Sequence, residues 1–96
     1  MHDAQFVWDE NKNRINIKKH KVSFDEAQTV FTDDNAILMP DNIHLKGEER
    51  FIIIGLSKHL RVLVVCHCYR ENDEVIRLIS ARKANNKESN LYGGVT

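Results

Sequence analysis

The sequence predicts an α+β fold: an antiparallel sheet with two N-terminal helices and one C-terminal helix, in the order β-α-α-β-β-β-β-α. Apolar, β-branched runs joined by short polar turns between Arg50 and Ser80 indicate the sheet. A helix-start signal at Ser23 and Glu26, followed by apolar residues at helical spacing, indicates a helix. A chain of 96 residues has the length for one core, so we expect a single domain over residues 1–96.

The N-terminal part is expected to form one short strand and two helices. Residues 6–8 are β-prone, and Asp9 is a suitable N-cap for a first helix over residues 10–20. The last turn of that helix is basic, which complements the negative end of the helix dipole. Ser23 and Glu26 form a capping box for the second helix.

The remainder of the chain is expected to be mainly strand. Four apolar runs are interpreted as strands, over residues 37–39, 50–57, 61–69 and 74–80. The first of them should end at Pro40, and short turns between the other three predict an antiparallel meander. Ser80 is the expected N-cap of the last helix, which runs to Tyr92 and stops at Gly93 and Gly94.

Composition is that of an ordinary globular protein, with 42% hydrophobic and 29% charged residues. The longest apolar run, residues 62–66, is too short to span a bilayer, and no export signal precedes it, so we expect a cytoplasmic protein without a membrane segment. Cys66 and Cys68 share one strand face while His67 points to the other. This arrangement favours reduced thiols and predicts no metal site and no cofactor.

The formal net charge is zero, which by itself argues against a polyanionic partner. The distribution is uneven, however: residues 1–49 carry 6 basic and 10 acidic groups (−4), and residues 50–96 carry 8 basic and 4 acidic groups (+4). A basic C-terminal half is compatible with phosphate binding. Solvated surface charge without a partner explains the same count equally well.

Metal-free RNA cleavage needs a base for the 2′-hydroxyl proton, an acid for the leaving oxygen, and cations for the phosphorane. The candidates from the residues alone are Lys19, His20, Arg50, Arg77, Arg82, Lys83 and Tyr92. Each has a structural alternative. His20 can instead cap the first helix, and Arg50 can pair with the neighbouring Glu48 or Glu49.

Arg77 shares a strand face with apolar neighbours, where a cation must be paired or must line a polar groove. Arg82 and Lys83 are expected in the first turn of the last helix, where a bound phosphate would offset their unfavourable interaction with the dipole. His67 and Tyr69 have the alternatives of stacking on bases or lying buried with satisfied polar atoms.

The sequence resembles the BrnT toxin family from about residue 6 to residue 92. The matching blocks, in order, are Trp8-Asp9-Glu10 with Lys12, Lys19-His20, Val22-Ser23-Phe24, Glu48-Glu49-Arg50-Phe51, Ile54-Gly55-Leu56-Ser57 and Ile79-Ser80-Ala81-Arg82-Lys83-Ala84. The resemblance implies a RelE-like fold and a metal-independent endoribonuclease that inhibits translation. It also implies a BrnA-type ribbon-helix-helix antitoxin, a heterotetramer of two toxins and two antitoxins, and contact with operator DNA only through the antitoxin.

Carried over by position, the resemblance implies a polar motif made of Lys19, His20, Arg50, Arg82, Glu88 and Tyr92. His20 or Glu88 would transfer protons and the arginines would bind phosphate, with Lys19, Arg77 and Lys83 holding the RNA. The chain departs from the family pattern at Lys21, where glycine is usual, and at residues 68–70. The alternatives are an inactive module that keeps the fold and binds RNA or the antitoxin, and a small structural domain that dimerises.

Overall fold

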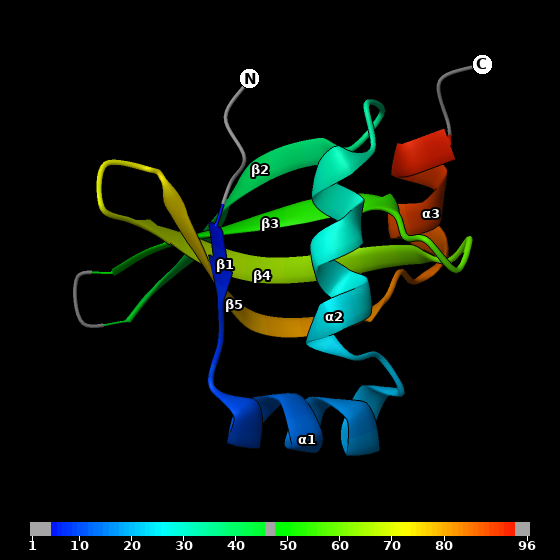
Figure 1. Ribbon diagram of the computed structural model, residues 1–96. Helices are drawn as coiled ribbons and strands as arrows, with labels where there is room; N and C mark the ends of the chain where they lie inside the picture. The colour runs from blue at the N-terminus through cyan, green and yellow to red at the C-terminus, as the bar shows by residue number, and fades with distance from the viewer. Residues whose placement is uncertain (1–4, 46–47, 94–96) are drawn as a thin grey trace.

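The computed structural model describes residues 5–45 and 48–93, which form one five-stranded sheet with helices packed against it (Figure 1). The elements are β1 (Gln5–Val7), α1 (Glu10–His20), α2 (Phe24–Ala27), the 3-10 helix η1 (Gln28–Thr32), β2 (Ile37–Leu45), β3 (Glu48–Leu56), β4 (Val62–Arg70), β5 (Val75–Lys83) and α3 (Asn86–Gly93). Gly94, part of the expected helix stop, lies outside the described residues. No helix within the described ranges is both long and apolar enough to cross a membrane.

The sheet is mixed, so the expectation of a purely antiparallel sheet was wrong. Its strand order is β1-β5-β4-β3-β2, and β2 to β5 form the predicted antiparallel meander. β1 instead runs parallel to β5, with Gln5 opposite Val75 and Val7 opposite Arg77. Parallel partners need a long connection, and here that connection is the rest of the domain.

The helical part before the meander also differs from the prediction. α1 has the expected bounds and cap, because the Asp9 side chain accepts hydrogen bonds from the backbone N–H groups of Asn11 and Lys12. Lys21 ends α1 in the left-handed conformation with φ 62°, in the place where glycine is favoured. Two α-helices were expected, but only α1 is long. α2 is a single turn that continues as the 3-10 helix η1.

The capping box of α2 is only half formed. Ser23 Oγ accepts a hydrogen bond from Glu26 N at 3.0 Å, as predicted. The Glu26 side chain, however, turns inward, and the residue is only 3% exposed. It accepts hydrogen bonds from the Arg61 guanidinium and from Ser57 Oγ, and the Arg61 contact holds the pKa of Glu26 below its usual value despite burial. This ion pair fastens α2 to the β3–β4 turn.

The predicted C-terminal ends of two strands were wrong. β2 does not stop at Pro40 but continues to Leu45, which is possible because β2 is an edge strand and Pro40 needs no hydrogen-bond partner on its outer side. β5 does not end at Ser80 but extends to Lys83. Arg82 therefore lies in a strand and not in the first turn of a helix.

The last helix, α3, begins after Asn85 and not after Ser80. Asn85 Oδ1 accepts from Glu88 N at 2.8 Å, and Glu88 Oε1 accepts from Asn85 N at 2.9 Å. These reciprocal bonds form a capping box, which satisfies N–H groups that have no partner within the helix. The start of α3 is thus set by Asn85 and Glu88.

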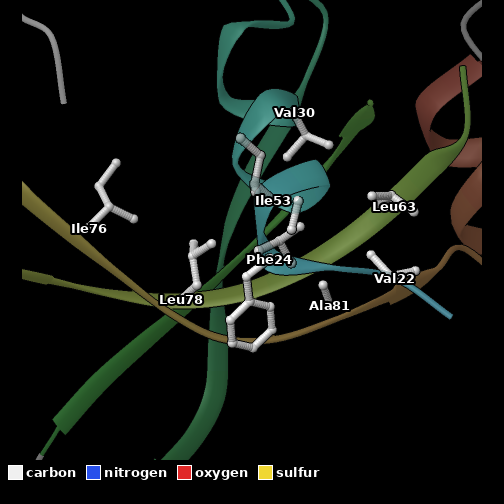
Figure 2. Packing of buried hydrophobic residues seen from close by; sticks show 10 residues of the cluster. Val22, Phe24, Val30, Ile53, Leu63, Ile76, Leu78 and Ala81 are labelled. Carbon is white, nitrogen blue, oxygen red and sulfur yellow. The ribbon is translucent and has the colours of Figure 1, made fainter. Parts of the chain in front are cut away.

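The core lies between α2–η1 and one face of the sheet (Figure 2). Phe24, Val30 and Ala27 from the helical segment are fully buried against the strands. Their strand partners are Ile53, Leu63, Val65, Ile76, Leu78 and Ala81. Burying each large side chain contributes roughly 1.5–3 kcal/mol. The helices therefore cover this face, and the opposite face remains for other contacts.

Candidate active site

Three of the predicted cations lie on the sheet face opposite α2 and η1. We call this the arginine face, and it carries Arg50, Arg77 and Arg82. Strand register shows the common face: Arg77 lies opposite Cys68, and Arg82 lies opposite Val64. Arg50, in β3, lies on the same face. Its neighbour Phe51 pairs with His67 on the core side of the sheet, so Arg50 must point to the opposite side.

A β-bulge separates Arg77 from Arg82 along β5. His67 pairs with Leu78 while the preceding Cys66 pairs with Ser80, so Ile79 is the extra residue. The bulge shifts the alternation by one position. As a result Ser80 and Arg82 join Arg77 on the arginine face, although the spacing from 77 to 82 is odd.

Arg82 and Glu88 form a bidentate ion pair. Arg82 Nη1 lies 2.7 Å from Glu88 Oε1, and Arg82 Nη2 lies 2.8 Å from Glu88 Oε2. The hydrogen bonds from Arg82 lower the pKa of Glu88, and the carboxylate in turn raises the pKa of Arg82. Glu88 is therefore an ionised carboxylate near neutral pH, and it can accept a proton but has none to donate.

Tyr92, the other predicted residue of α3, is tied to the rest of the protein by Asp33. Its hydroxyl donates to Asp33 Oδ2 at 2.6 Å. The same oxygen accepts from Leu56 N at 2.8 Å, and Asp33 Oδ1 accepts from Asn35 N at 3.0 Å. Burial raises the pKa of Asp33, but these three hydrogen bonds together lower it below its usual value. The contact raises the pKa of Tyr92, so the phenol is protonated.

His20 and Lys19, at the end of α1, lie along the edge of β5 that is not paired with β4. With Lys12, Ile15 and Asn16 of α1, they line a cavity of about 190 Å³ together with Ile79 and Ser80 of β5. Ser80 is exposed and precedes Arg82 by two residues on the same face. His20 therefore borders Ile79 and Ser80 of β5, and Arg82 lies two residues beyond Ser80 in the same strand.

Arg50 and Arg77 lie farther along the arginine face. Arg50 is mostly buried: its Nε is 3.6 Å from Glu48 Oε1 and makes no hydrogen bond within the described residues. Glu48 also pairs with Arg70 at 3.1 Å. Arg77 is half-buried and forms no ion pair in residues 5–45 and 48–93. The Arg77 guanidinium and the Nε atom of Arg50 thus retain capacity to bind an anion.

Lys83 is separated from this group. It lies opposite Leu63 at the end of β5, so its side chain leaves the sheet on the face opposite Arg82. It is exposed. Of the residues predicted to bind RNA, Lys83 is the one that strand alternation turns away from the arginine face.

The cysteines and His67 are placed as the alternation predicts. Cys66 and Cys68 are free thiols on the arginine face, and burial raises the pKa of Cys66 to about 11 and also raises that of Cys68. His67 is fully buried on the other face, between the rings of Phe31 and Phe51. The buried alternative for His67 is therefore correct, and base stacking on its ring is ruled out.

Two residues that position the site were not among those predicted from the sequence. Asn16 is buried in α1 and hydrogen-bonds Ala81 of β5, and Asp33 holds Tyr92. One signal could have indicated Asn16: α1 has almost no apolar face, so a polar side chain must hold the helix to the sheet. Asp33 follows the 3-10 helix in an ordinary turn sequence, and nothing local marks it.

Comparison with known proteins agrees with this architecture. Residues 8–88 match the profile of a family described as "Ribonuclease toxin, BrnT, of type II toxin-antitoxin system". The fold is similar to the 1.1 Å crystal structure of the Brucella abortus ribonuclease toxin BrnT, with a TM-score of 0.67 and 24% identity. That match covers 88% of this chain and 100% of the other. A search of curated proteins gave no match.

The fold and the matched profile define a small α+β ribonuclease toxin of a type II toxin-antitoxin system. The chain belongs to the BrnT toxin family, and the resemblance seen in the sequence is confirmed. A toxin of this type has RNA as its substrate and an antitoxin as its partner.

Proposed function

We propose that this chain is a metal-independent endoribonuclease of RelE-like type that acts on RNA across β5, between the end of α1 and the start of α3. The observation that carries the proposal is that His20 lines a cavity with Ser80 of β5, two residues before Arg82, which pairs with Glu88. One side supplies an imidazole, and the other supplies a guanidinium with an ionised carboxylate. These groups suffice for proton transfer and for charge stabilisation.

In the proposed reaction the 2′-hydroxyl of the RNA attacks the adjacent phosphorus and loses its proton to Glu88. His20 protonates the departing 5′-oxygen, so the products are a 2′,3′-cyclic phosphate and a 5′-hydroxyl. Arg82 and Arg50 stabilise the negative charge of the phosphorane, and Tyr92 donates a hydrogen bond to it once released from Asp33. Glu88 is the base and not the acid because Arg82 lowers its pKa.

The remaining cations are assigned to binding of the RNA backbone. Arg77 has no carboxylate partner in the described part of the chain and lies on the face of Arg82. Lys19 lines the cavity beside Ser80. Lys83, on the other face, would contact only RNA that wraps around the end of β5. Phosphate neutralisation by these groups predicts binding that weakens steeply with salt.

The wider biological role follows from family membership and belongs to the same proposal. The toxin acts in the cytoplasm, cuts RNA and thereby inhibits translation. A BrnA-type antitoxin with a ribbon-helix-helix domain neutralises it in a complex of two toxins and two antitoxins. Contact with operator DNA is made by the antitoxin.

The test is incubation of the purified protein with a structured RNA in EDTA, followed by analysis of the fragment ends. Cleavage to 2′,3′-cyclic phosphates is expected, with a loss of at least about 100-fold in His20→Ala and Glu88→Gln, as for removal of a general acid or base. Arg14→Ala, an exposed change on α1 that removes only a contact with Asn11, is the matched control. Binding of RNA without cleavage by the wild-type protein would instead identify an inactive binding module.

A further inference from the structure

A second cavity, of about 630 Å³, lies away from the proposed active site. We call it the hairpin groove, and it is lined by Leu38, Glu48, Glu49, Phe51, Tyr69, Arg70 and Asp73. Figure 1 shows β3, β4 and β5 continuing beyond α2 on the side away from α3, where no labelled helix lies in front of them. Phe51 pairs with His67, so the floor of the groove belongs to the face opposite Arg82.

The floor of the hairpin groove is aromatic and rigid. The rings of Phe51 and Tyr69 meet edge to face at 5.2 Å. The Tyr69 hydroxyl lies 3.2 Å from His67 Nε2, which fixes the orientation of the ring. At the side, Leu38 is 52% exposed. The groove therefore offers a preformed aromatic surface and an apolar wall to a ligand.

The rim of the groove carries uncompensated negative charge. Glu49 and Asp73 are exposed and form no ion pair in the part of the chain that the structure describes. Glu48 is already paired with Arg70 at 3.1 Å. Asp73 lines the groove together with Phe51 and Tyr69, and its charge adds to burial in raising the pKa of Tyr69. Two free carboxylates thus stand beside two aromatic rings.

This combination selects a cation with a flat, apolar surface. A guanidinium group stacks on aromatic rings and binds carboxylates through its N–H groups, and it loses less hydration than a lysine ammonium. RNA phosphates would be repelled by the same carboxylates. The groove is therefore complementary to an arginine side chain with an apolar neighbour that contacts Leu38.

We propose that the hairpin groove binds an arginine-containing segment of the antitoxin polypeptide. The proposal rests on the chain having the antitoxin partner of its family and deepens the proposed function by giving that partner a docking surface. The groove lies on the sheet face opposite Arg82, so this contact supplies affinity without touching the proposed catalytic groups. Charge complementarity sets its specificity and its salt dependence.

The test uses this toxin chain and its antitoxin partner, with affinity measured by calorimetry and RNA cleavage measured on the same preparations. The double charge reversal Glu49→Lys with Asp73→Lys is expected to weaken antitoxin binding at least about tenfold. Cleavage of RNA by the free double variant should be unchanged. Asp34→Lys reverses an exposed carboxylate outside the groove and should leave the affinity at the wild-type value.

Leu38→Ser tests the apolar wall separately and is expected to weaken binding without changing its salt dependence. Unchanged antitoxin affinity in the double charge-reversal variant would overturn the proposal. So would a changed RNA affinity with unchanged antitoxin affinity, or an altered mass of the antitoxin-free protein in sedimentation, because these results assign the groove to RNA or to a second copy. Absence of cleavage by the wild-type toxin bears on the proposed function and leaves the antitoxin affinities interpretable.

Discussion

Asn16 binds the backbone of Ala81 with both groups of its side-chain amide. Its Nδ2 donates to Ala81 O at 2.8 Å, and its Oδ1 accepts from Ala81 N at 3.1 Å. Nδ2 also donates to Val22 O at 2.8 Å. The short strand β1 covers β5 only from Val75 to Arg77. Asn16 therefore occupies the place of a strand residue along the uncovered part of the edge and joins α1 to the sheet.

Asn16→Ala is expected to destabilise the protein by about 2–4 kcal/mol, because it leaves buried N–H and C=O groups of β5 without partners. The free energy of unfolding in urea measures the effect. Asn11→Ala on the same helix removes only an exposed contact with Arg14 and serves as the control. Equal stability of the Asn16 and Asn11 variants would contradict this account of the β5 edge.

His67 should make stability depend on pH below about 6.5, the pKa of an exposed histidine. Burial lowers the pKa of His67, so the unfolded chain binds a proton that the folded protein rejects. The stability that His67 contributes by staying neutral is fully present above that pH and is lost as the pH falls below it. Unfolding in urea at pH 7.5 and 5.5 should show this loss, and His67→Phe should reduce it. His59→Gln, an exposed change, should retain it.

Tyr92→Phe should destabilise the protein by about 1 kcal/mol through loss of one hydrogen bond. Asp33→Ala should destabilise the protein by more than this, since Leu56 N and Asn35 N also lose their acceptor. No residue of α3 is buried, so polar contacts carry much of its attachment. Hydrogen exchange of α3 amides should accelerate in both variants. Unaltered exchange would show that Arg82 and Glu88 alone hold the helix.

Gly55→Ala should destabilise the protein by about 1–3 kcal/mol, as overpacking of a core does. A Cβ atom at this position would lie 3.1 Å from Ala36 Cβ and 3.2 Å from both Val30 Cβ and Val30 O. The 3-10 helix η1 would have to move away from β3. Gly93→Ala, where a Cβ meets nothing within 4 Å, is the control. Equal urea midpoints for the two variants would contradict the close approach.

Local sequence signals predicted the meander and the first helix well, because strands β3 and β4 are long apolar runs and Asp9 is a strong cap. They failed at the end of β5, where Ser80 has the chemistry of an N-cap but Ala81 is held in the sheet by Asn16, 65 residues earlier. The parallel pairing of β1 with β5 could not be predicted from local sequence signals either. It depends on a contact between distant segments and leaves no periodic pattern.

The candidate residues other than Glu88 were found from their residue types and expected positions, Glu88 was added by family resemblance, and their arrangement came from the structure. The bulge at Ile79 decides that Arg77 and Arg82 share a face, and an alternation rule applied without it separates them. Asn85 and Glu88 have the spacing of a capping box, a signal that the sequence does contain. The prediction missed it because Ser80, an equally suitable N-cap earlier in the chain, indicates an earlier start for the last helix.

The pairing of β1 with β5 also sets the order in which the protein can assemble. The first strand and α1 have no final place until residues 75–83 have been made, because Gln5 lies opposite Val75 and Asn16 binds Ala81. A chain leaves the ribosome from its N-terminus, so α1 emerges before the β5 residues that it contacts have been made. A chain that ends before residue 82 therefore lacks the arginine side of the proposed site.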